Sequence, residues 1–144
     1  MQLDTNIIAS VEQHVVEHFA QKMPDVFVYH DLQHTRNVVG AIVEIAEGYE
    51  LTNKEMELLK LAAWFHDTGY DKGAKDHEQR SCQYARNFLQ QFEYSEEDLD
   101  VICGCIMATK LPQSPRNLLE QIIGDADMSH LGKKNYWDRC GRVR

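Results

Sequence analysis

The stretch that decides the fold is residues 61–70, LAAWFHDTGY, in which a histidine and an aspartate follow an apolar run. The surrounding pattern predicts a helix over residues 52–68 that Gly69 ends. On this helix His66 continues the apolar face, so its side chain is expected to point into the core. Polar and charged groups resist burial unless they are hydrogen-bonded, paired or bound to a metal. The pair His66–Asp67 therefore requires a partner inside the protein.

Working outward, apolar residues recur at helical spacing in five further segments, and no segment alternates as a half-buried strand does. These predicted helices span about residues 3–23, 31–49, 76–92, 95–110 and 115–131. Residues 25–33 are expected to form an extended connection, with Asp31 as the N-cap of the helix that follows. Residues 133–144 end without a C-cap, which indicates a fragment of a slightly longer bundle. We predict one all-α domain over residues 1–144, a bundle of six or seven helices.

The composition excludes several classes of function. The net charge is −8 and the isoelectric point is near 5.3, which argues against a broad nucleic-acid surface. No apolar run reaches the roughly 18 residues that a transmembrane helix needs. The N-terminal residues lack the basic start and compact apolar centre of a signal peptide. We therefore expect a cytoplasmic protein that acts on a small molecule and has no membrane partner.

The cysteines give no metal-binding signature. The chain has four, and their spacing matches no zinc-knuckle pattern: Cys82, Cys103, Cys105 and Cys140. The pair Cys103–Gly104–Cys105 is too isolated to indicate a metal site. We interpret all four as free thiols in or near the helical core.

Helical phase directs three more polar side chains inward. His34 lies one turn before Val38, and His77 likewise precedes an inward-facing series by one turn. Asp127 continues an apolar series of four-residue spacing, whereas its neighbour Asp125 falls on a polar face. Imidazole and carboxylate groups suit a divalent first-row metal, which would also offset buried negative charge. A buried hydrogen-bonded network without an ion stays open as the alternative.

The order His34, His66–Asp67 and Asp127 resembles the H…HD…D signature of the HD-domain superfamily. The segments that carry the resemblance are YHDLQHTRNVV (29–39), LAAWFHDTGY (61–70), DHEQRS (76–81) and TKLPQSPRNLLEQIIGDADMSHLG (109–132). The third is similar to a segment of deoxynucleotide triphosphohydrolases, and the last to the closing segment of small metal-dependent HD phosphohydrolases. The resemblance covers about residues 25–132.

This resemblance implies a helical bundle that holds one divalent ion per chain, with Mn, Fe, Ni, Co, Zn and Mg as candidates. By position, the four metal ligands are His34, His66, Asp67 and Asp127. It also implies hydrolysis of a phosphate ester or anhydride, with nucleotides among the candidate substrates. A metal-bound hydroxide would attack phosphorus, and Asp67 would orient or deprotonate that water. His77 would protonate the leaving oxygen or contact the substrate.

The chain departs from the binuclear members of the superfamily at one position. Those enzymes add two histidines, and His77 stands where the first would be. Ala108 stands near the place of the second, which leaves a second ion one ligand short. The candidate cations for the substrate's phosphate oxygens are Lys110, Arg80 and Arg36. Two alternatives stay open: a catalytically idle HD module that binds a nucleotide or a partner protein, and an HD-type di-iron oxygenase, which the missing ligand disfavours.

Overall fold

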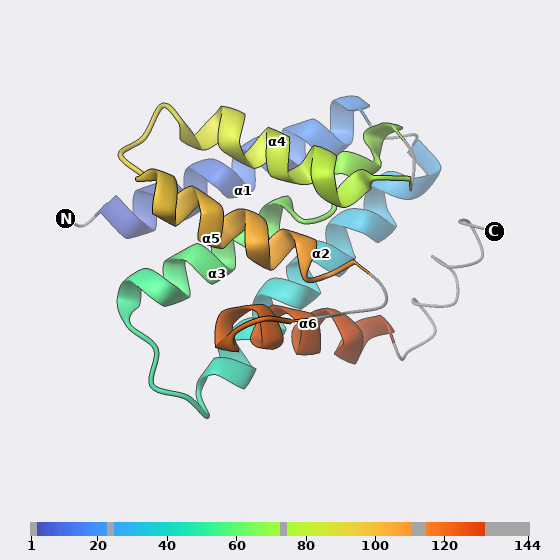
Figure 1. Cartoon of the computed structure of the whole chain (residues 1–144). Helices are drawn as coiled ribbons and strands as arrows, with labels where there is room; N and C mark the ends of the chain where they lie inside the picture. Colours follow the sequence, from blue (N-terminus) through green and yellow to red (C-terminus); the bar gives the residue numbers. More distant parts are fainter. Residues whose placement is uncertain (1–2, 23–24, 73–74, 111–114, 132–144) are drawn as a thin grey trace.

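The computed structural model describes residues 3–22, 25–72, 75–110 and 115–131. Within these ranges there are six α-helices, a 3-10 helix and no strand, which confirms the all-α prediction (Figure 1). The elements are α1 (Leu3–Lys22), α2 (Asp25–Ala46), α3 (Asn53–Phe65), the 3-10 helix η1 (Thr68–Lys72), α4 (His77–Leu89), α5 (Glu96–Met107) and α6 (Leu118–Leu131).

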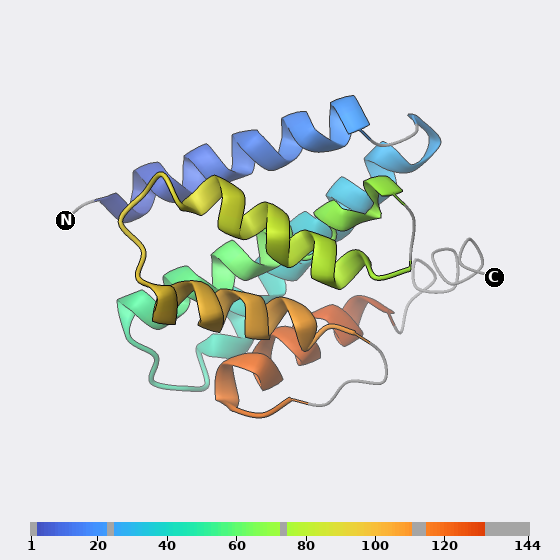
Figure 2. The same ribbon diagram turned by 45° about the horizontal axis from the view of Figure 1, so that its top comes forward.

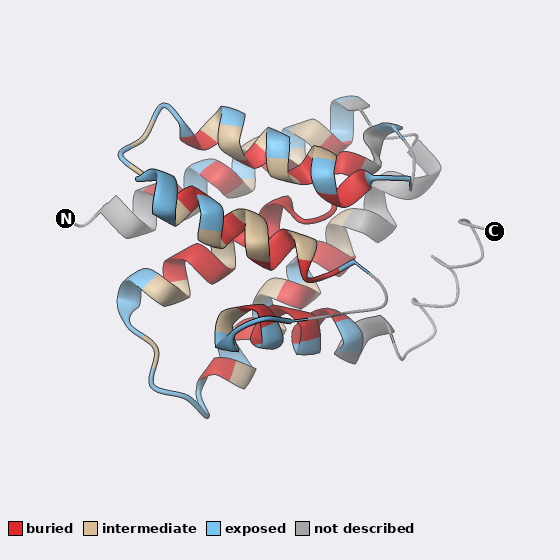
Figure 3. Ribbon diagram, in the orientation of Figure 1, coloured by how far each residue is buried: buried red, intermediate tan, exposed pale blue. Residues whose placement is uncertain are grey.

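Helix α3 lies at the centre of the bundle and contacts the other five α-helices. In the turned view of Figure 2, α4, α5 and α6 lie side by side in that order, each in contact with the next. Figure 3 shows buried residues along α3, whereas α4 and α5 alternate buried and exposed positions. Residues 61–69 are all buried. The last part of α3, residues 61–65, is therefore enclosed on all sides, and His66 and Asp67, which follow it, lie inside the protein.

The local signals for helix stripes and helix starts agree with the structure. In α1, the four-residue repeat buries Ile7, Val11, Val15 and Phe19. At the start of α3, Thr52 Oγ1 accepts a hydrogen bond from the Glu55 N–H at 3.0 Å, and the Glu55 carboxylate accepts one from the Thr52 N–H at 2.9 Å. Ser95 caps α5 in the same reciprocal way. These caps satisfy backbone groups that a helix start leaves without partners.

Two predictions about α2 are wrong. The helix begins at Asp25, so residues 25–33 are helical and Asp31 lies inside the helix rather than at its N-cap. The extended character of this stretch came from Val, Phe and Tyr, whose preference for strands is weak and yields to tertiary context. No glycine or proline interrupts these residues, so nothing within the stretch opposes a helix.

Other helix boundaries differ by about a turn. Helix α3 ends at Phe65 and is followed by η1, so Gly69 does not end it. Helix α4 ends at Leu89 and α6 begins at Leu118, inside their predicted ranges. The segment 133–144, whose missing C-cap led us to expect a fragment of a longer bundle, lies outside the described residues. No described helix combines the length and the apolar character that crossing a bilayer requires.

Candidate metal centre

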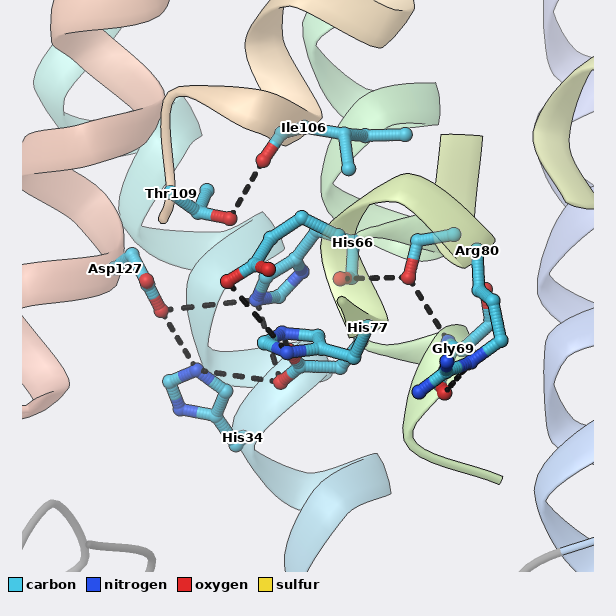
Figure 4. A network of polar contacts seen from close by, with 12 residues as sticks. His34, His66, Gly69, His77, Arg80, Ile106, Thr109 and Asp127 are labelled. Carbon is cyan, nitrogen blue, oxygen red and sulfur yellow. Dashed lines mark hydrogen bonds and ion pairs between the residues drawn. The ribbon is translucent and has the colours of Figure 1, made fainter. Parts of the chain in front are cut away.

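Four polar side chains from three parts of the fold meet at the end of α3 (Figure 4). All four are buried: His34 of α2, His66 and Asp67 directly after α3, and Asp127 of α6. His34 Nε2 lies 2.8 Å from Asp127 Oδ1, and His66 Nε2 lies 3.6 Å from the same oxygen. Asp67 Oδ2 lies 3.8 Å from His34 Nε2 and 3.4 Å from His66 Nε2. The structure therefore brings together the four residues singled out as ligands.

The spacing of these atoms suits a bound ion. His34, His66 and Asp127 each offer one ligand atom, and these atoms lie within 4.8 Å of one another. Two adjacent ligands that each lie about 2.1 Å from one ion are separated by about 3 to 3.5 Å. The separations within the cluster are close to that range, and two imidazoles with carboxylates are a ligand set that divalent transition metals accept.

One nitrogen of His66 has no hydrogen-bond partner although it is buried. The Nδ1–H of His66 donates to the Ala63 carbonyl oxygen at 2.7 Å. This bond orients the ring and leaves Nε2 facing Asp67 and Asp127, where it makes no hydrogen bond. Buried polar atoms normally have partners, and a metal-binding imidazole commonly donates its other N–H to a backbone carbonyl. The ring is thus oriented so that Nε2 faces the position where an ion could bind.

The charges of the cluster support the same conclusion. Burial lowers the pKa of His66, but the carboxylates of Asp67 and Asp127 outweigh it and raise the pKa to about 9. Burial also raises the pKa of Asp127, but hydrogen bonding to His34 and the nearby His66 lower it to about 2. Without a metal, His66 therefore carries a proton beside an ionised Asp127. A dication would replace that proton, because both bind the same nitrogen.

Comparison with known proteins agrees with this geometry. The family model of the HD domain matches residues 31–131. The chain belongs to the HD-domain family. That family consists largely of metal-dependent phosphohydrolases and includes members without catalytic activity. The matched range contains the whole candidate centre. Neither the curated proteins nor the solved structures contained a match to the chain.

In this HD-domain protein, helical phase separates the two aspartates of α6. Asp127 is buried in the centre, whereas Asp125, two residues earlier, is exposed. The four-residue series that includes Ile123 places Asp127 on the inner face, and Ile123 is fully buried as well. The sequence prediction about which aspartate points inward is confirmed.

His77 reaches the centre from the other side of Asp67. It is the first residue of α4 and is buried. Its Nε2 lies 3.4 Å from Asp67 Oδ1, and its Nδ1 lies 3.5 Å from Glu78 Oε2. Asp67 thus presents one oxygen to His34 and His66 and the other to His77. The contact between Glu78 and His77 was not predicted, because residues adjacent in sequence normally point to different sides of a helix. The one signal in the sequence was that Glu78 directly follows His77 in DHEQRS.

Three residues hold η1 against α4, and we call them the clasp: Gly69, Arg80 and Ser81. The Ser81 hydroxyl donates to the His66 carbonyl oxygen at 2.9 Å and accepts from the Gly69 N–H at 2.8 Å. Arg80 Nε donates to the Gly69 carbonyl oxygen at 2.8 Å. A Cβ atom on Gly69 would lie 2.1 Å from the His77 carbonyl oxygen. Gly69 is therefore required for close packing of η1 on α4, which sets His77 beside Asp67.

The structure places the three candidate cations differently. Lys110 is exposed and follows the last turn of α5. Arg80 belongs to the clasp. Arg36 is exposed on α2, with its guanidinium 3.9 Å from Glu12 Oε2 of α1. Ala108, which the resemblance places near the expected second-ion histidine, is buried at the C-cap of α5.

We expect Asp127→Ala to remove the ion and Asp125→Ala to retain it. Purified wild-type protein should contain about one divalent ion per chain, and loss of the ion should lower the melting temperature because the ion binds only the folded state. Elemental analysis and thermal unfolding of both variants provide the measurement. Equal metal loss in Asp125→Ala would contradict the assignment of the inner face.

We expect Gly69→Ala to destabilise the protein by about 1–3 kcal/mol or more, because the new methyl group has no space against the backbone of α4. Gly40→Ala is the matched control. A Cβ atom at Gly40, on an exposed part of α2, meets nothing within 4 Å. That change should be neutral or should stabilise by up to about 1 kcal/mol. Urea unfolding measures both, and similar midpoints for the two variants would disprove the tight contact at Gly69.

Proposed function

We propose that this HD-domain protein hydrolyses a phosphate ester or anhydride with one divalent ion bound by His34, His66, Asp67 and Asp127. The observation that supports this most directly is the buried His66 Nε2, which lacks a hydrogen-bond partner and lies beside two carboxylates. Membership of the HD-domain family supports the class of reaction. The net charge of −8 favours a small phosphorylated substrate, such as a nucleotide, over a long nucleic acid.

When bound, such an ion supplies Lewis acidity to a phosphoryl oxygen and to water. Asp67 and His77 have the remaining roles in the proposed reaction. Asp67 has one oxygen toward the ligand histidines and the other toward His77, so it orients the attacking water and holds the His77 ring. His77 delivers a proton to the leaving oxygen, because it lies beside the ligand set without being needed to complete it.

We assign the contact with the substrate's phosphate oxygens first to Lys110. Its side chain is exposed, whereas Arg80 donates to the Gly69 carbonyl oxygen and Arg36 faces Glu12. A cation near the transferred group stabilises the charge that develops in the transition state. Arg80 and Arg36 are the second choices, and each would have to change its present contacts in order to bind substrate.

Hydrolysis of phosphomonoesters and nucleotides by protein of known metal content tests this function. We expect turnover with Mn²⁺ or Ni²⁺, and none after chelation or in His66→Ala, because the imidazole ligand would be absent. Release of inorganic phosphate is the measurement. A protein that binds its ion fully and hydrolyses no member of the panel would contradict the proposal and favour an idle HD module, for which Ala108 is the structural argument.

We expect His77→Ala to keep its metal and to lower kcat by about 10²- to 10⁴-fold on an alkyl or nucleotide phosphate, because the leaving oxygen loses its proton donor. The loss should be much smaller on a nitrophenyl ester, whose leaving group needs little protonation. Gln79→Ala is the control, since Gln79 is exposed in the same turn of α4. Metal loss in His77→Ala would indicate a ligand, and full activity on both substrates would exclude either role.

A further inference from the structure

Two cysteines face each other across the interface of α4 and α5. The Cys82 thiol donates to the Cys103 carbonyl oxygen at 3.5 Å, and the Cys103 thiol donates to the Cys82 carbonyl oxygen at 3.8 Å. This reciprocal contact brings the two residues together although they are far apart in the sequence. Both side chains are partly exposed, so a small oxidant can reach them.

The two thiols differ in acidity. The neighbouring Cys82 thiol and the nearby Arg86 guanidinium outweigh burial and lower the pKa of Cys103 to about 7. The neighbouring Cys103 side chain, together with burial, raises the pKa of Cys82. At neutral pH Cys103 is thus a partial thiolate with a protonated thiol beside it. A thiolate next to a second thiol is the arrangement that reacts with peroxides and then resolves to a disulfide.

Cys105 provides an internal contrast. It is buried, and burial raises its pKa to about 12, with the carboxylate of Glu120 acting in the same direction. Residues two positions apart on a helix point to nearly opposite sides, so Cys103 contacts α4 while Cys105 faces the interior. The two cysteines of Cys103–Gly104–Cys105 therefore have separate surroundings, and only Cys103 has a thiol partner among the described residues.

We propose that Cys82 and Cys103 form a peroxide-sensitive thiol pair that closes reversibly to a disulfide between α4 and α5. The Cys103 thiolate attacks one oxygen of hydrogen peroxide, the O–O bond breaks, and Cys103 becomes a sulfenic acid while hydroxide leaves and takes up a proton. The Cys82 sulfur then attacks the sulfenic sulfur, the S–O bond breaks, and water leaves with the Cys82 proton. In sum, two thiols and one peroxide give one disulfide and two waters.

The modification site adjoins the clasp. Cys82 directly follows Ser81, whose hydroxyl bridges the His66 carbonyl oxygen and the Gly69 N–H. The disulfide would tie this turn of α4 covalently to α5. The proposal rests on contacts outside the metal centre, so it stands or fails independently of hydrolysis.

Peptide mapping of the full chain under non-reducing conditions tests the proposal. Cleavage after lysine and arginine places Cys82 in residues 81–86 and both α5 cysteines in residues 87–110. After hydrogen peroxide, we expect these two peptides to be joined with loss of two hydrogen atoms, and to separate after a dithiol reductant. Wild-type protein suffices for this measurement, so it does not depend on the folding of any variant.

Variants locate the bond. Cys105→Ser should keep the joined peptides and Cys103→Ser should abolish them, since Cys103 is the proposed attacking thiol. In Cys82→Ser, the sulfenic acid on Cys103 should persist and be trapped by dimedone, because its resolving thiol is absent. Joined peptides that persist in Cys103→Ser would overturn the proposal. So would wild-type protein in which peroxide leaves both thiols reduced or oxidises them without joining them.

Discussion

The candidate centre depends on negative charge buried beside the central helix. Asp67 and Asp127 are carboxylates in the interior of a bundle whose central helix is buried on all sides over residues 61–65. Such groups are stable there only with a compensating charge and hydrogen-bond partners. In the metal-free protein the raised pKa of His66 supplies one positive charge. A divalent ion would balance both carboxylates and leave His34 and His66 neutral, which is the form in which imidazole binds metals.

The end of α3 explains how neighbours in sequence reach one centre. Successive residues of a helix differ by about 100° around its axis, so a histidine and an aspartate in mid-helix would diverge. Here His66 is the C-cap, and the chain then turns into η1. The clasp fixes that turn through Ser81, which binds the backbone on both sides of Asp67. Positioning of the aspartate therefore depends on α4 as much as on α3.

Helical periodicity was sufficient to predict which side chains of a given helix point into the core. It distinguished Asp127 from Asp125 and placed His34 and His77 inward, because burial of one face follows from the spacing of apolar residues. It failed where distant segments decide the structure. The early start of α2 at Asp25 has no local signal, and the role of Gly69 depends on a backbone atom of His77. The contact of Cys82 with Cys103 likewise arises only when α4 packs on α5.

Asp67 links the two halves of the proposed mechanism. One carboxylate oxygen faces the ligand histidines and the other faces His77, so any change at Asp67 alters ion binding and the setting of His77 together. The Ala108 side chain offers no lone pair near the place where the resemblance leads us to expect a second-ion ligand, and one dication matches the formal charge of Asp67 and Asp127. A second ion beside His77 would add two positive charges, against which Glu78 offers one negative charge. Charge balance and ligand number therefore both support the proposed single ion and leave His77 available for the proposed proton transfer.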